Sequence, residues 1–265
     1  MISVAGARVL FNKGTALETV ALQHVDLTVD SGQFITVIGS NGAGKSTLLN
    51  ALAGEVRLDA GTILIADVDP TRATPRGRAG LVARVFQDPR VGTCEDLTIE
   101  ENLALAARRG RRRGLERALS RHARALFRER LAALGLGLDS RLHDRMGLLS
   151  GGQRQAIGLL MATLAPMRLL LLDEHTAALD PKTGAFVLDL TRRLVAEQKL
   201  TAIMVTHSMR DALACGDRTV MLDGGRVVYD VSGAARSRLD VPDLLRLFGE
   251  ARGGQVVDED RLLLG

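Results

Sequence analysis

The feature of this sequence that most restricts its fold is a glycine-rich loop placed between an apolar strand and a helix. Residues 34–38 form a short apolar run, residues 46–52 have helical character, and between them lies Gly39-Ser40-Asn41-Gly42-Ala43-Gly44-Lys45-Ser46. The glycines let the backbone curl until several N–H groups point at one phosphate, and the helix adds the positive end of its dipole. Lys45 can reach the β- and γ-phosphates, and Ser46 can ligate Mg²⁺. A chance glycine-rich loop would lack this context, so the sequence predicts a nucleotide-phosphate site.

Apolar runs typical of strands alternate with amphipathic stretches along the chain. Strands are expected at residues 8–11, 22–29, 34–38, 169–172 and 201–205, and a hairpin at residues 219–229. Helical character is expected across residues 97–165, with Thr98 as an N-cap and Glu101 completing a capping box, and then at residues 183–195, 210–214 and 242–248. Such alternation predicts an α/β fold with a mostly parallel sheet.

Composition places the chain among ordinary globular proteins. Of its 265 residues 46% are hydrophobic, which allows a sizeable core, and a net charge of +4 suits an anionic ligand without requiring nucleic acid. Cys94 and Cys215 lack metal-ligand spacing, which favours two unpaired thiols in a reducing compartment. The N-terminus lacks a signal-peptide pattern, and no apolar run reaches the ~18–20 residues that span a bilayer. If the protein acts at a membrane, we expect another chain to supply the spans.

Two carboxylates follow the apolar run at residues 169–172. A buried strand would deliver the first, Asp173, rigidly to a Mg²⁺ site, and the second, Glu174, could then polarise a water that attacks the γ-phosphate. Many strands end in acids, so the pair is weak evidence alone. Its place after a phosphate loop, in the appropriate chain order, makes it strong evidence for nucleotide hydrolysis.

A second candidate anion site lies at Leu149-Ser150-Gly151-Gly152-Gln153, where a loop is expected to meet a helix. Small residues, free N–H groups and a helix N-terminus can together bind a phosphate. A plain helix cap would explain the segment equally well if it stood alone. Because the chain already has one phosphate loop, a second anion site indicates that it contacts a nucleotide held by another molecule.

With these motifs in place, the chain resembles the ATPase subunits of ATP-binding-cassette (ABC) transporters. The phosphate loop, Phe86-Gln87-Asp88, the LSGGQ signature, Asp173-Glu174, Ala178-Leu179-Asp180 and His207 occur in the order of that family. In the family two subunits pack head to tail, and each ATP lies between one subunit's phosphate loop and the other's signature. The resemblance, which covers about residues 11–230, therefore implies an ATPase that acts as a dimer.

The resemblance also implies roles for individual residues. Glu174, His207, Gln87 and Lys45 would serve catalysis, and Ser46, Gln87 and Asp173 would hold Mg²⁺. Phe11 would stack on adenine, although the family more often has Tyr and a core Phe at a strand end is the alternative. The expected ATP contacts are Phe11, Gly39, Ser40, Asn41, Gly42, Ala43, Gly44, Lys45, Ser46, Thr47, Ser150, Gly151, Gly152, Gln153 and Asp180.

The implied fold is a P-loop NTPase α/β core with an N-terminal antiparallel β part and an inserted α-helical subdomain. We expect the core at residues 1–90 and 165–231, the helical signature subdomain at 91–164, and a C-terminal helix and tail at 232–265. Implied partners are a second, most simply identical, ATPase subunit, a transmembrane permease and an extracytoplasmic solute-binding protein, with no nucleic acid. The expected location is cytoplasmic, at the inner face of the cell membrane.

Some positions depart from the common family pattern. His175 stands where Pro is usual, Ala177 where Ser is usual, and Ala156 and Met161 where arginines are common. None removes a group needed for hydrolysis. Residues 158–164 and 173–181 instead resemble a bacterial importer subgroup, some members of which are linked to tryptophan or tyrosine uptake. We therefore expect import of a small solute, with an exporter, a lipid transport system or a non-transport regulator as alternatives.

Arginines crowd the expected helical subdomain, at Arg108, Arg109, Arg111, Arg112, Arg113, Arg117, Arg121, Arg124 and Arg128. A solvated helix face is the ordinary explanation of such a run. We nevertheless expect this segment to contact acidic permease loops or anionic lipid headgroups, and nucleic-acid binding is disfavoured because the run has one aromatic, Phe127. A stand-alone GTPase or kinase is disfavoured, because an Asn-Lys-x-Asp guanine motif is missing and the signature would be unexplained.

Overall fold

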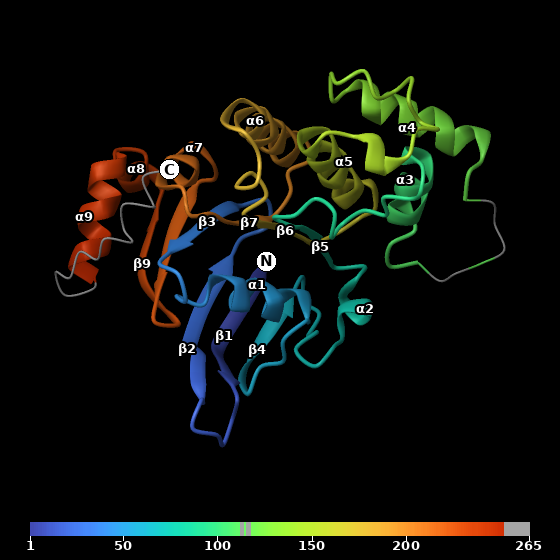
Figure 1. Ribbon diagram of the computed structural model, residues 1–265. Coiled ribbons are helices and arrows are strands. Elements are labelled where there is room, and N and C mark those ends of the chain that lie inside the picture. The colour runs from blue at the N-terminus through green and yellow to red at the C-terminus, as the bar shows by residue number, and fades with distance from the viewer. Residues whose placement is uncertain (112–113, 115–117, 252–265) are drawn as a thin grey trace.

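The computed structural model describes residues 1–111, 114 and 118–251. Its strands form two sheets (Figure 1). One has three strands in the order β2-β1-β4, and the other has six in the order β5-β6-β7-β3-β8-β9. Helix α1 lies between the two sheets, while α5, α6 and α7 cover the opposite face of the larger one (Figure 1). The mixed α/β architecture expected from the sequence is confirmed.

The smaller sheet is antiparallel and is built from β1 (Ile2–Phe11), β2 (Thr19–Val29) and β4 (Ala60–Ile65). The strand expected at residues 8–11 is much longer than predicted, because Ile2 and Val4 also face the core. Strand β4 was not predicted. Its sequence exposes Leu64 while Ile63 and Ile65 are buried, as is typical of a strand with one covered face.

The larger sheet holds the core of the molecule. Strands β3 (Phe34–Gly39), β5 (Val82–Val85), β6 (Leu169–Asp173), β7 (Ala202–Val205) and β8 (Arg218–Asp223) run parallel, and β9 (Arg226–Ser232) pairs antiparallel with β8. Every residue of β3 and β7 is buried, which explains their continuous apolar sequences. The predicted hairpin is β8–β9, and β5 was not predicted.

Helices fill three apolar clusters around these sheets. The first, around α1 (Lys45–Ala53), lies between the sheets. The second packs α6 (Pro181–Glu197) and the residue 99–164 helices against the other face of the larger sheet. The third joins α7 (Met209–Ala214) to α9 (Val241–Ala251). Two further helices, α2 (Pro75–Arg78) and α8 (Gly233–Arg236), are only four residues long. None of the helices in the described ranges combines the length and the apolar character that a membrane span requires.

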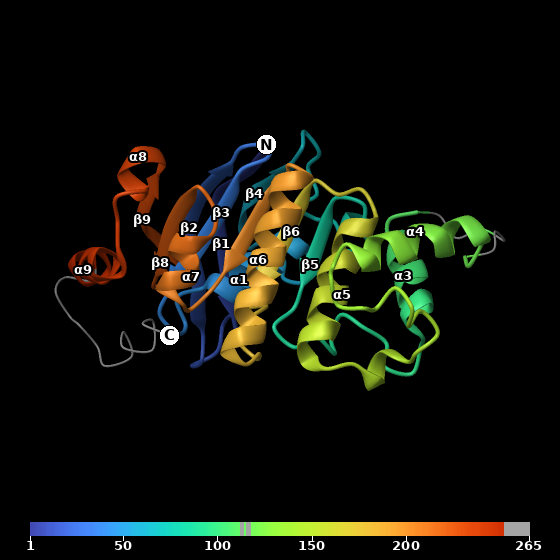
Figure 2. The same cartoon turned by 90° about the horizontal axis from the view of Figure 1, so that it is seen from above.

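The helical segment contains α3 (Ile99–Ala107), α4 (Arg121–Ala132), the 3₁₀ turn η1 (Met146–Leu148) and α5 (Gly151–Leu164). The predicted capping box at α3 is present: Thr98 Oγ1 accepts from the Glu101 N–H, and the Glu101 carboxylate accepts from the Thr98 N–H. Helices α3 and α4 lie at the end of the molecule beyond β5, and α8 and α9 lie at the opposite end (Figures 1 and 2).

Candidate active site

The glycine-rich loop follows β3, which lies between β7 and β8 in the larger sheet, and leads directly into α1. Gly44 is the N-cap of α1 and has φ 98°, and Gly42 has φ 77°, both in the region that favours glycine. A Cβ on Gly44 would lie 2.5 Å from the Ala21 carbonyl oxygen. Only glycine therefore lets this loop pass so close to β2, and the start of α1 is left open as an anion site.

Lys45 is buried within the loop. Its Nζ donates to the carbonyl oxygens of Gly39, at 2.8 Å, and Ser40, at 3.0 Å. Burial lowers the pKa of the Lys45 ammonium, and the negative charges of Glu174 and Asp173 act in the opposite direction. The cation is thus held beside the loop by two carbonyls and two carboxylates, where an anion bound to the loop would meet it.

A cavity of about 310 Å³ joins the loop to the ends of two neighbouring strands. Glu174 follows β6, and His207 lies two residues beyond β7. The His207 Nε2 and Glu174 Oε1 atoms lie 2.6 Å apart. Lining residues are Thr19, Val20, Ala21, Asn41, Gly42, Ala43, Gly44, Lys45, Ser46, Thr47, Glu174 and His207.

Glu174 has φ 44°, a left-handed conformation that costs a residue with a side chain about 1–3 kcal/mol. Such strain collects at functional sites. The backbone there is held by a hydrogen bond from the Glu174 N–H to the Val205 carbonyl at 3.0 Å. The turn after β6 therefore aims the Glu174 carboxylate toward His207 and the loop cavity.

Asp173, the first of the two acids, is mostly buried at the end of β6 and accepts a hydrogen bond from Arg84. Hydroxyl and carboxylate oxygens are the ligands that Mg²⁺ prefers, so Ser46 in the cavity and Asp173 beside Lys45 fit such an ion. Arg84 was not singled out from the sequence. The sequence feature that could have identified Arg84 is a charged residue placed among the apolar residues of β5.

Gln87 and the signature line a different cavity, of about 570 Å³. Its lining includes Gln87, Gly151 and Ala178, and in the described part of the chain it shares no residue with the loop cavity. Ser150 is the N-cap of α5: its Oγ accepts from the Gln153 N–H at 3.3 Å, and the Gln153 side chain accepts from the Ser150 N–H at 3.2 Å. Within one chain the signature thus caps α5 and borders a cavity other than that of the phosphate loop.

The remaining expected contacts lie around these two cavities. Phe11 is 41% exposed and pairs across β1 and β2 with Thr19, which lines the loop cavity. Asp180 is exposed and caps α6, and its hydrogen bonds with Thr183 lower the pKa of the Asp180 carboxyl. A Cβ on Gly152 would lie 2.0 Å from Thr183 Cγ2, so this signature glycine is needed for α5 to pack on α6.

The described arginines of the helical segment divide into two kinds: Arg111, Arg121 and Arg128 are exposed, whereas Arg109 and Arg124 bond to other residues of the chain. Arg109 is partly buried and donates to the Ala165 carbonyl at 3.2 Å, and Arg124 forms an ion pair with Glu100 at 2.7 Å. The expected helical spacing begins at Arg121, because Ser120 caps α4. The expectations for Arg112, Arg113 and Arg117 lie outside the described residues.

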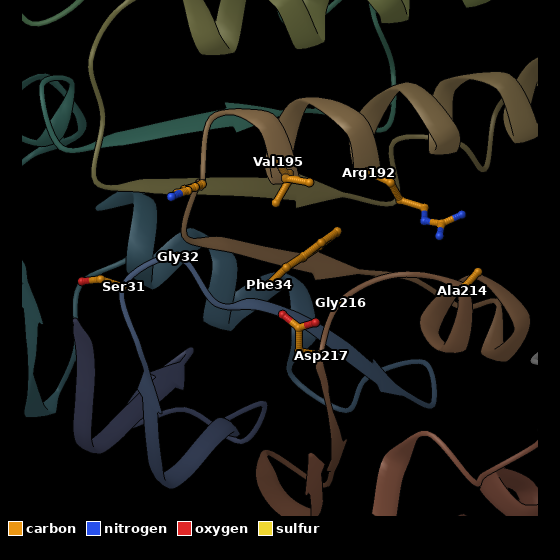
Figure 3. A pocket seen from close by; sticks show the side chains of 10 residues that line it. Ser31, Gly32, Phe34, Arg192, Val195, Ala214, Gly216 and Asp217 are labelled. Atoms are coloured by element: carbon orange, nitrogen blue, oxygen red, sulfur yellow. The ribbon is translucent and has the colours of Figure 1, made fainter. Parts of the chain in front are cut away.

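A cavity of about 750 Å³ lies away from the phosphate loop, at the amino end of β3 (Figure 3). Phe34 rises from β3 toward Val195 on α6, and Asp217 lies just before β8 (Figure 3). Ligands of parallel α/β sheets bind beyond the carboxyl ends of the strands. The phosphate loop, Asp173, Glu174 and His207 all lie at that other edge, so the position of this cavity does not suit the nucleotide.

Comparisons with known proteins agree with this geometry. The family model described as "ABC transporter" matches residues 22–177. A tyrosine transport ATP-binding protein of Clostridioides difficile is 42% identical over 226 residues, 85% of this chain and 90% of that protein. The thiamine import ATP-binding protein ThiQ of Escherichia coli is 35% identical over 77% of this chain and 82% of its own. A phosphonates import ATP-binding protein of Rhodopseudomonas palustris is 35% identical over 91% of this chain and 85% of its own.

Solved structures show the same fold. The dimeric ATP-binding cassette MJ0796 bound to ADP and Pi superposes with a TM-score of 0.74 at 26% identity, covering 88% of this chain and 98% of that one. The cassette MJ1267 in its ADP conformation gives a TM-score of 0.76 at 22% identity, covering 94% of this chain and 98% of its own.

Proposed function

Because this chain belongs to the ABC transporter family as an ATP-hydrolysing subunit, we propose that two copies form a dimer that powers import of a small solute through a separate permease. The observation that carries the proposal is the loop cavity, in which Lys45, Glu174 and His207 meet. The relatives named above are import or transport ATPases, and MJ0796 is a dimer of such cassettes.

In the proposed mechanism the loop N–H groups and Lys45 hold the β- and γ-phosphates. A Mg²⁺ ion held by Ser46 and Asp173 would neutralise phosphate charge. Gln87, which lines the neighbouring signature cavity, would be a further ligand from that side. Glu174 orients the attacking water and accepts its proton, and His207 contacts the γ-phosphate. The His207–Glu174 contact of 2.6 Å supports this pairing of roles.

The signature serves the partner's nucleotide in this proposal. Ser150, Gly151, Gly152 and Gln153 open α5 beside a cavity separate from the chain's own phosphate loop. A head-to-tail dimer would bring this helix N-terminus to the γ-phosphate bound by the other subunit, with Asp180 at the interface and Phe11 against adenine. We propose a homodimer, because one chain carries the complete set of motifs.

The transporter partners complete the proposal. We propose a transmembrane permease, an extracytoplasmic solute-binding protein, a position at the cytoplasmic face of the membrane, and no nucleic-acid partner. The cargo proposed is an aromatic amino acid, supported by the name of the Clostridioides difficile relative at 42% identity. Reconstituted with its permease and binding protein, the ATPase should respond to tyrosine or tryptophan more than to thiamine or phosphonate.

The water-orienting role is tested with Glu174→Gln. Loss of the carboxylate removes water activation but leaves the phosphate contacts, so the variant should bind ATP, barely hydrolyse it and accumulate as a dimer in size-exclusion chromatography. Asp189→Asn, an exposed change on α6, is the matched control and should behave as wild type. A Glu174→Gln protein that stays monomeric with wild-type turnover would contradict the assignment.

The two-subunit site is tested by mixing inactive variants. Lys45→Ala disables a phosphate loop, and Ser150→Arg blocks a signature while sparing ATP binding by the monomer. A mixed dimer contains one site in which both Lys45 and Ser150 are intact, so the mixture should hydrolyse ATP faster than either variant alone. Failure of Ser150→Arg to bind ATP even as a monomer would place the signature in the chain's own site and overturn the dimer arrangement.

A further inference from the structure

Arg84 is a mostly buried cation inside a four-residue strand, β5, whose other residues are apolar. Its side chain is only 11% exposed. Removing a guanidinium from water costs free energy that acceptors must offset, and shortening or replacing it leaves those acceptors unpaired. The two terminal nitrogens of Arg84 have acceptors, whereas its buried Nε has none among the described residues. The position is otherwise suited to an apolar residue, so the charge calls for an explanation beyond packing.

The acceptors of Arg84 come from α1, from the turn after it and from β6. Nη1 donates to Asn50 Oδ1 in the last turn of α1 at 2.8 Å and to Glu55 Oε2 just beyond that helix at 2.7 Å, and Nη2 donates to Asp173 Oδ2 at the end of β6. The guanidinium carbon also lies 4.8 Å from the centre of the Phe86 ring, one residue before Gln87. A planar guanidinium can bond both groups at once in a fixed geometry, which a lysine cannot.

The hydrogen bonds of Arg84 fix the Asp173 carboxylate relative to the phosphate loop. Helix α1 begins at Lys45, so the bond from Arg84 to Asn50 ties Asp173 to the helix that follows the phosphate loop, and the bond to Glu55 adds an anchor two residues beyond the end of that helix. The negative charge of Asp173 also acts on the Lys45 ammonium, so this carboxylate interacts with cations of both β5 and the phosphate loop. Because Oδ2 is bound by Arg84, rotation of the Asp173 carboxylate is restricted, and a metal-binding role would fall to its other oxygen.

We propose that Arg84 is a positioning residue that holds the Asp173 carboxylate in the orientation needed to bind Mg²⁺ with the nucleotide. The inference rests on the proposed function, in which Asp173 is a metal ligand. Residues that orient metal ligands typically change metal affinity by about 10–100-fold when replaced.

Arg84 has two opposite effects on Mg²⁺ affinity, so a measurement of that affinity can test the proposal. As a nearby positive charge, Arg84 repels a divalent cation, so its removal would strengthen Mg²⁺ binding. As an anchor, it preorganises the ligand, so its removal would weaken Mg²⁺ binding. The proposal requires the second effect to dominate.

The test is binding of a fluorescent ATP analogue to the full chain, titrated with Mg²⁺ and repeated in EDTA. Arg84→Met should raise the Mg²⁺ concentration for half-maximal binding by about tenfold, while affinity in EDTA stays close to wild type. Arg84→Lys keeps the positive charge but loses the planar guanidinium that bonds several acceptors at once. It should also raise the Mg²⁺ concentration for half-maximal binding, called the half-point below. Arg141→Met, which breaks another arginine–aspartate pair at 2.7 Å, is the matched control and should leave the half-point unchanged.

A half-point for Arg84→Met equal to or below wild type would overturn the proposal. If thermal melting shows that Arg84→Met does not fold, Arg84→Lys decides alone: a raised half-point supports positioning, and an unchanged one refutes it. Failure of the proposed function looks different, because the wild type itself would then show no Mg²⁺-dependent nucleotide binding, and the assignment of Arg84 would fall with it.

Discussion

His175, directly after Glu174, should make the stability of this protein fall sharply in mild acid. It is 1% exposed, and its Nε2 lies 2.8 Å from Thr191 Oγ1. The Thr191 hydroxyl already donates to the Val187 carbonyl at 2.8 Å, so the His175 Nε2 carries a proton and donates to Thr191 Oγ1. Burial lowers the pKa of this imidazole from 6.5 to about 4.

The direction of the change in the free energy of unfolding with pH follows from proton binding. Between pH 6.5 and 4 the unfolded chain protonates His175 and the folded chain does not, so unfolding takes up a proton and stability declines as the pH falls. The stability that neutral His175 contributes is present in full above its unfolded pKa of 6.5, and it is lost as the pH falls toward the folded pKa of about 4. A shift of this size corresponds to about 3 kcal/mol in full, of which about 2 kcal/mol would be lost between pH 7 and pH 5.

The measurement is urea unfolding of the protein without nucleotide, at pH 7 and at pH 5. His175→Gln keeps an N–H donor for Thr191 but cannot be protonated in this range. The free energy of unfolding of the wild type should fall by about 2 kcal/mol more than that of the variant over this interval. Equal losses in the two proteins would refute the reasoning, because His175 would then not be neutral and buried in the folded state.

Three further predictions concern the packing of Gly152, the capping of α3 and the reactivity of the two cysteines. Gly152→Ala should destabilise the protein by about 1–3 kcal/mol through the clash with Thr183, and adding Thr183→Ser, which removes the clashing methyl, should restore part of this in urea unfolding. Thr98→Ala should cost about 1 kcal/mol by removing the capping box of α3, whereas an exposed change such as Glu129→Gln should cost little. Cys94 is exposed and should be alkylated in the folded protein, whereas Cys215 is buried with its pKa raised to about 12 and should react only on unfolding, as mass spectrometry of wild type and Cys94→Ser can check.

Local sequence was sufficient for the loop, the acid pair and the helix caps. The backbone of Gly39 to Ser46, the turn at Asp173-Glu174 and the cap at Thr98 each depend on a few consecutive residues, so their patterns are visible without the fold. The roles expected for Gln87, Phe11 and Asp180 depend on a partner or a ligand and remain predictions.

What the sequence did not predict depends on contacts between distant segments. Strand β5 is only four residues long, and Arg84 interrupts its apolar pattern, because the acceptors of that arginine lie on α1 and β6. Strand β4 is recognisable only once β1 pairs with it. The buried position of His175 was likewise invisible, since its hydrogen-bond partner is Thr191, sixteen residues away on α6.

The separation of the loop cavity from the signature cavity has a kinetic consequence. If each active site needs the loop of one chain and the signature of another, a dilute solution contains almost no complete sites. The hydrolysis rate would then rise with the square of the protein concentration until dimers predominate, and linearly above that point. A permease that holds two copies side by side would abolish this dependence, so turnover in the cell would be set by assembly on the membrane partner rather than by the abundance of the free subunit.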